Sequence, residues 1–186
     1  SVLIIISLTQ LFLTSMVLGI IFFYFKIGSS PFIMLRDAVT APIFQLNPDF
    51  ITENGTGLNI LLQNYWMVIH PPTLFLGFSI CLIPFAYAIS ALRLSDFRGW
   101  ILPTKKWLIY SIIVLGIGIM MGAYWAYETL NFGGYWNWDP VENAVYVPWL
   151  FLVASLHSVI LTQKNRQYYK MSLILSFISF ILILYS

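Results

Sequence analysis

Residues 69–92 read IHPPTLFLGFSICLIPFAYAISAL, an apolar stretch without a single Lys, Arg, Asp or Glu. A helix needs about 20 such residues to cross the hydrocarbon core of a bilayer, so this stretch is long enough to span a membrane. Further apolar stretches of the same character occupy residues 2–25, 107–127, 145–161 and 171–185. The sequence therefore predicts an all-α, polytopic transmembrane bundle of about five spans, forming a single membrane domain over residues 1–186.

The composition indicates the same class of protein. Hydrophobic residues make up 60% of the chain and charged residues only 9%, whereas a soluble domain carries about 25% charged residues. A soluble fold with this composition would lack the polar side chains to cover its surface, so membrane lipid must solvate much of the chain. The small net charge of +2, without a basic patch interleaved with aromatics, gives no sign of a nucleic-acid partner.

Basic residues decide the predicted direction of the spans. Most of the nine Lys and Arg residues lie in or beside the second and fourth connections, namely Arg93, Arg98, Lys105, Lys106, Lys164, Arg166 and Lys170. The positive-inside rule places these connections on the cytoplasmic or matrix side of the membrane. The first and third connections, residues 26–68 and 128–144, are then expected on the positive side of the membrane, facing the periplasm or intermembrane space.

The third connection lies in a tryptophan-rich loop, residues 124–149. The loop holds four of the seven tryptophans, which are Trp125, Trp136, Trp138 and Trp149. Gly133-Gly134 permits close backbone approaches, and the segment 139–142, Asp-Pro-Val-Glu, is typical of a capped helix start, so we expect short helices in this loop. Such a cluster suits an aromatic belt at the membrane interface, or the stacking of a flat ligand such as a porphyrin.

The chain has two histidines. His70 precedes a proline, which biases its backbone away from helix, and we expect it at the outer mouth of the second span, on the same side of the membrane as the tryptophan-rich loop. His157 lies inside the fourth span, where an ionisable side chain is costly and marks a functional site by default. His70 can cap a helix, bind water or ligate a metal, whereas His157 can form a hydrogen bond to a neighbouring helix or serve as an axial heme ligand. The single cysteine, Cys81, is too few for a thiolate metal site, and we expect it in the core.

Several segments resemble one family. Residues 132–144, FGGYWNWDPVENA, resemble the tryptophan-rich "WWD" signature of heme-handling membrane proteins. GTGLN at 55–59, LLQN at 61–64 and IHPP at 69–72 also resemble the CcmF family, the heme-lyase subunit of cytochrome c maturation system I. The resemblance runs from about residue 55 to residue 166.

This resemblance implies roles for individual residues. His70 would ligate heme iron at the outer site, and His157 would ligate the iron of a resident b-type heme. The cofactor-binding residues of the loop would be Gly133, Gly134, Tyr135, Trp136, Trp138 and Asp139. Heme b would arrive on a heme chaperone, and thioether bonds would join heme to the Cys-x-x-Cys-His segment of apocytochrome c.

The chain also departs from the family pattern. Family members often carry Trp where this chain has Phe132 and Tyr135, and full-length members supply two more ligating histidines. We therefore expect one part of a multi-subunit holocytochrome c synthase, such as the N-terminal half of a split mitochondrial protein. A second CcmF-like chain would complete both heme sites.

The expected location is the mitochondrial inner membrane with the loop facing the intermembrane space, or else a bacterial inner membrane with the loop facing the periplasm. Two other functions remain open at this point. The chain can be a non-catalytic heme-lyase relative, retained as a structural subunit or assembly factor of a respiratory membrane complex. It can also be a heme exporter or carrier, although the Asp-Pro-Val-Glu-Asn-Ala ending of the signature argues against that.

Overall fold

The computed structural model describes residues 1–47, 49–51, 54–55, 57–131 and 133–185. Its elements in chain order are α1 (Val2–Leu18), β1 (Ile20–Phe22), β2 (Phe25–Ile27), α2 (Leu35–Ala38), α3 (Pro42–Leu46), the 3-10 helix η1 (Ile60–Leu62), α4 (Tyr65–Leu94), α5 (Ile101–Thr129), α6 (Pro140–Lys164), the 3-10 helix η2 (Arg166–Tyr168) and α7 (Tyr169–Tyr185). The structure groups the chain into two compact units. We call them the N-terminal unit (residues 7–58) and the bundle unit (residues 1–6 and 59–186).

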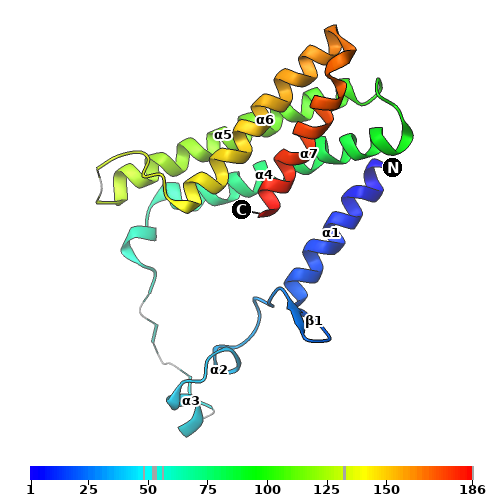
Figure 1. Ribbon diagram of the computed structural model, residues 1–186. Coiled ribbons are helices and arrows are strands. Elements are labelled where there is room, and N and C mark those ends of the chain that lie inside the picture. The colour runs from blue at the N-terminus through cyan, green and yellow to red at the C-terminus, as the bar shows by residue number, and fades with distance from the viewer. Residues whose placement is uncertain (48, 52–53, 56, 132, 186) are drawn as a thin grey trace. The chain divides into compact units, whose positions relative to one another are not determined.

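Four helices make up most of the bundle unit (Figure 1). α4 contacts α5 and α7, and α6 also contacts α5 and α7, so the four helices surround a common core. Leu108, Leu115 and Leu152 are fully buried there, together with Cys81. Among the described residues, the helices at 65–94, 101–129, 140–164 and 166–185 are long and apolar enough to cross a membrane, and α1 is a shorter apolar helix. The prediction of a helical membrane bundle is therefore confirmed.

Glycines let α4 and α5 approach each other closely. A Cβ atom added at Gly77 would lie 3.0 Å from Leu115, and one added at Gly118 would lie 2.7 Å from Leu74. Lipid tails are as apolar as leucine, so helices in a membrane associate largely through close van der Waals packing, which small residues permit. The glycines therefore determine where the start of α4 rests on the end of α5.

Hydroxyl side chains join α6 to α7. Ser155 Oγ lies 2.7 Å from Ser176 Oγ, while Ser172 Oγ lies 2.9 Å from Ser158 Oγ and 2.7 Å from Thr162 Oγ1. All five residues are buried. Interhelical hydrogen bonds of this kind contribute about 0.6 kcal/mol each in a membrane protein. We call this set the hydroxyl ladder.

In the N-terminal unit, α1 ends at Leu18, although the apolar stretch predicted a span to Phe25. Gly19 adopts a φ of +65°, a left-handed conformation that stops a helix and that glycine accommodates without strain. The following residues form an antiparallel hairpin in which β1 pairs with β2. The residues of these strands up to Phe25 are as apolar as those of a membrane span, so the sequence alone predicted a helix that continues to residue 25.

Candidate functional site

Three helix ends meet at one end of the bundle unit, which we call the loop end. α4 begins there, α5 ends there and α6 begins there, because short connections join successive antiparallel helices (Figure 1). Asn64, the N-cap of α4, donates a hydrogen bond from Nδ2 to Glu128 Oε2 at the end of α5 (3.1 Å). Trp125 Nε1 donates to the backbone oxygen of Leu61 (3.2 Å). These bonds fix the start of α4 against the end of α5.

His70 lies in the second turn of α4, in helical backbone. The expectation of non-helical backbone before Pro71 was wrong, because α4 begins five residues earlier. Asn64 caps the helix by accepting a hydrogen bond from the backbone N–H of Trp66 (2.8 Å), and both Pro71 and Pro72 are accommodated inside α4. The imidazole therefore stands at the loop end, as predicted, but on a helix.

A backbone carbonyl of α5 orients the His70 ring. Its Nδ1 lies 2.8 Å from the oxygen of Gly118. A carbonyl oxygen only accepts hydrogen bonds, so Nδ1 carries a proton, and in the neutral ring the lone pair is then on Nε2. A Cβ atom at Gly122 would lie 2.5 Å from Cε1 of the ring. The imidazole is thus pressed against the backbone of α5 in one orientation and one tautomer.

His70 shares a cavity of about 110 Å³ with residues of the tryptophan-rich loop. The polar lining includes Trp136, Asp139 and Glu142. The indole Nε1 of Trp136 is buried and has no hydrogen-bond partner among the described residues. Three of the predicted site residues, His70, Trp136 and Asp139, are therefore brought together at one cavity.

The start of α6 has the predicted capping box. Glu142 N–H donates to Asp139 Oδ1 (2.7 Å), and Glu142 Oε2 accepts from the N–H groups of Asp139 (3.3 Å) and Asn137 (2.8 Å). These contacts hold residues 137–139 against the first turn of α6. The expected short helices are not in residues 130–131 or 133–139 of the loop; α2, α3 and η1 lie in the first connection instead.

Aromatic rings pack edge to face around the capping box. The ring centroids lie 5.9 Å apart for Trp136 and Trp138, 5.6 Å for Trp136 and Tyr146, and 6.1 Å for Trp138 and Tyr146. Each such pair contributes about 0.5–1.5 kcal/mol beyond simple burial, so the loop is held firmly on α6. Trp138 has a φ of +57° and is 66% exposed, so it presents an open indole face.

Tyr135 belongs to a different ring contact. It stacks on Tyr127 of α5 with centroids 4.3 Å apart and planes 7° from parallel. The diglycine before it does not line the His70 cavity. Gly133 has a φ of +70° with open space where a Cβ would lie, and Gly134 is half-buried. Phe132, the other departure from the family pattern, lies outside the described residues.

An apolar groove of about 680 Å³ runs along α5 near the loop end. Trp66, Tyr124, Tyr146 and Trp149 give it aromatic walls. Trp149 is fixed by a hydrogen bond from its Nε1 to the backbone oxygen of Ile112 (3.0 Å). The sequence did not predict this groove, because its walls come from three helices. The only signal in the sequence was the enrichment of aromatic residues near the helix ends.

His157 lies on α6, about 25 Å along the helix from its start at a rise of 1.5 Å per residue. The structure therefore does not bring it to the His70 cavity. Its side chain is exposed on the surface of the bundle unit. Nδ1 lies 2.8 Å from the backbone oxygen of Val153, so Nδ1 of this ring also carries a proton, and in the neutral ring the lone pair is on Nε2.

Comparison with known proteins gives consistent matches. The family model described as "Cytochrome C assembly protein" matches residues 2–186. The chain is 36% identical over 155 residues to the cytochrome c-type biogenesis protein CcmF of Pseudomonas aeruginosa, covering 82% of this chain and 23% of that protein. It is 38% identical over 146 residues to CcmF of Escherichia coli, covering 77% and 22%.

A solved structure titled "Cytochrome c Heme Lyase CcmF" matches with a TM-score of 0.58 at 36% identity, covering 65% of this chain and 21% of that chain. The present chain thus spans less than a quarter of the length of these curated relatives.

Proposed function

Because this chain belongs to the cytochrome C assembly protein family, we propose that it is one part of a cytochrome c heme lyase. The loop end would hold heme for attachment to the Cys-x-x-Cys-His segment of apocytochrome c, and His157 would hold a resident b-type heme. Relatives named for cytochrome c biogenesis and a solved relative named as a heme lyase support this function.

The shared tautomer of the two histidines carries the proposal. In each ring Nδ1–H donates a hydrogen bond to a backbone carbonyl 2.8 Å away, so the neutral ring has its lone pair on Nε2, where a metal can bind. Metal-ligating histidines almost always donate their other ring N–H to a carbonyl or carboxylate in this way. His70 and His157 are the only histidines of the chain, and both have this arrangement.

We infer from the small His70 cavity that this chain would hold heme on an open surface. Its volume of about 110 Å³ is below the range of about 300–1,000 Å³ that ligand pockets usually have. The exposed rings of Trp138 and Tyr135 offer flat faces at the loop end. A second CcmF-like chain would supply the remaining wall and the second iron ligand of each heme.

The residues of the loop end would position heme and the apocytochrome. A bound heme supplies the two vinyl groups to which the cysteine thiols add. His70 would fix the iron through Nε2, and the capping box of Asp139 and Glu142 would keep the loop in place. The N–H of Trp136 remains available as a donor inside the cavity.

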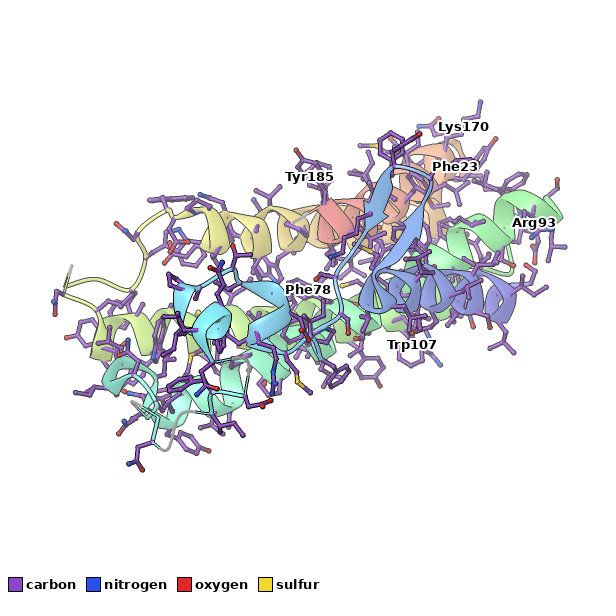
Figure 2. The ribbon with its side chains drawn as sticks, turned by 90° about the horizontal axis from the view of Figure 1, so that it is seen from below. Phe23, Phe78, Arg93, Trp107, Lys170 and Tyr185 are labelled. Atoms are coloured by element: carbon purple, nitrogen blue, oxygen red, sulfur yellow. The ribbon has the colours of Figure 1, made fainter. Side chains whose placement is uncertain are left out.

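Charge distribution supports an orientation for these sites. The basic residues of the bundle unit gather at its end opposite the loop end, where Arg93 and Lys170 project (Figure 2). By the positive-inside rule, the loop end would face the intermembrane space of a mitochondrion or the periplasm of a bacterium. Heme and apocytochrome c would then meet on that side.

A heme spectrum of the purified native assembly tests the proposal, together with mass spectrometry of the proteins that copurify. His157→Ala should remove the b-type signal and leave heme at the loop end, and His70→Ala should do the reverse, so each variant is the control for the other. An unchanged resident heme in His157→Ala would exclude His157 as its ligand. Absence of heme from the native assembly, with copurification of a respiratory complex, would favour the non-catalytic relative.

A further inference from the structure

Two adjoining hollows lie at the basic end of the bundle unit. The first, which we call the head pocket, has a volume of about 270 Å³ and is lined by Ser95, Asp96, Phe97, Arg98, Arg166 and Tyr169. The second, the tail groove, has a volume of about 520 Å³ and is lined by Leu92, Phe97, Tyr169, Lys170, Leu173, Ile174 and Phe177. Phe97 and Tyr169 line both, with ring centroids 4.9 Å apart, so the two hollows share a wall.

The head pocket carries excess positive charge. Arg98 and Arg166 line it, and the only acid among its lining residues is Asp96. Asp96 is engaged by its own turn, because its Oδ1 accepts hydrogen bonds from the backbone N–H groups of Gly99 (2.8 Å) and Arg98 (3.1 Å). These bonds lower the pKa of the carboxyl below its usual value, so it stays ionised. Two arginines and one carboxylate, already bonded within its own turn, therefore line the head pocket, and Lys170 adds a further cation in the lining of the tail groove.

The tail groove is apolar except for Lys170 and the phenol of Tyr169. Ile174 is 56% exposed, and Leu92 and Phe177 are exposed beside it. α7 contributes Leu173, Ile174 and Phe177, and the end of α4 contributes Leu92, so the groove runs from the basic end along a membrane-spanning helix. An occupant must therefore combine an anionic group with an apolar chain that continues at membrane depth.

We propose that these two hollows bind one anionic phospholipid, with its phosphate in the head pocket and an acyl chain in the tail groove. Basic pockets between transmembrane helices on the cytoplasmic or matrix side suit such headgroups. A soluble phosphate ester would use the arginines and leave the groove empty. A lipid without a phosphate would use the groove and leave the arginines without a counter-charge. An anionic phospholipid would fill the tail groove and also supply a counter-charge to the arginines.

The test measures lipid binding to the full chain in detergent by native mass spectrometry, using phosphatidylglycerol and phosphatidylcholine as probes. Each basic side chain at an anionic surface contributes a factor of about five, so Arg98→Gln with Arg166→Gln should weaken phosphatidylglycerol binding about 25-fold. Phosphatidylcholine carries the same phosphate, but its quaternary ammonium cancels the net charge, so its binding should weaken much less. The matched control is Lys105→Gln with Lys106→Gln, which removes the same charge outside the head pocket and should leave the preference for phosphatidylglycerol intact. An equal loss in both double variants would overturn the site and indicate general surface attraction.

A second pair of variants tests the tail groove. Ile174→Trp should fill the groove and weaken phosphatidylglycerol binding, whereas Ile181→Trp, at another exposed position of α7, should not. If Ile174→Trp has no effect while inorganic phosphate displaces the lipid, the pocket binds free anions and the lipid proposal is overturned. None of these measurements depends on heme, so failure of the lipid site leaves the proposed heme-lyase function to its own test.

Discussion

Substituting Gly122 by alanine should release the His70 ring from its fixed orientation. The added Cβ would lie 2.5 Å from Cε1 and 3.0 Å from each ring nitrogen, so the imidazole must shift away from α5. That shift breaks the 2.8 Å bond from Nδ1 to the Gly118 carbonyl. Crowding of this kind costs about 1–3 kcal/mol of stability, and the loss of such an orienting bond typically lowers metal affinity about 10- to 100-fold.

The assay is heme retention at the loop end of the purified assembly, measured alongside its thermal unfolding. Gly77→Ala is the matched control, because its Cβ would lie 3.0 Å from Leu115 in the same α4–α5 contact. Both variants gain about 1 kcal/mol of helix propensity, and both crowd the same pair of helices. Only Gly122→Ala also displaces the histidine, so it alone should lose heme.

Full heme retention in Gly122→Ala, as in Gly77→Ala, would contradict this prediction. It would mean that the Gly118 carbonyl does not orient the ring for iron, whatever the change in stability. A loss of heme in both variants would show instead that the spacing of α4 and α5 controls the site without a special contribution from His70.

Three further predictions concern stability, each measured by thermal unfolding of the purified protein. Asp139→Ala should lower the free energy of unfolding by about 1 kcal/mol, because the N–H of Glu142 loses its capping acceptor. Asp139→Asn keeps an acceptor and should lower it less, so equal losses in the two variants would contradict the capping role. Trp149→Phe should also cost about 1 kcal/mol by removing its hydrogen bond to a backbone carbonyl of α5, and an unchanged unfolding temperature would count against that bond. Asp96 has a folded-state pKa below its usual value, so its contribution should be present above the unfolded-state pKa and lost as pH falls through the folded-state pKa. Asp96→Ala should abolish that part of the acid dependence, and an identical pH profile would disprove it.

The sequence predicted those features that depend on neighbouring residues. The apolar stretches contained enough residues to indicate each long helix, and Asp139 and Glu142, three residues apart, indicated the capping box. The position of His70 at the loop end followed from the start of its span. The helical backbone of His70 was not predicted. Asn64 caps α4 five residues before His70, and the helix continues through His70 although a following proline disfavours helical backbone.

Other features depend on residues far apart in the chain. A helix in lipid is apolar on all sides, so hydrophobic periodicity does not indicate its inner face. The exposed side chain of His157 was therefore not predictable from α6 alone. The cavity beside Trp136 likewise requires α4, α5 and α6 together, and no local pattern indicates that the indole N–H is buried there without a partner among the described residues.

The hydroxyl ladder also determines the rotation of α6 about its own axis. Ser155, Ser158 and Thr162 face α7, and at 100° per residue His157 lies roughly 130° around the helix from their mean direction. Turning α6 to bury the imidazole would break the contacts with Ser172 and Ser176. Three modest hydrogen bonds on one side of a helix thus keep a polar ring pointing outward on the other.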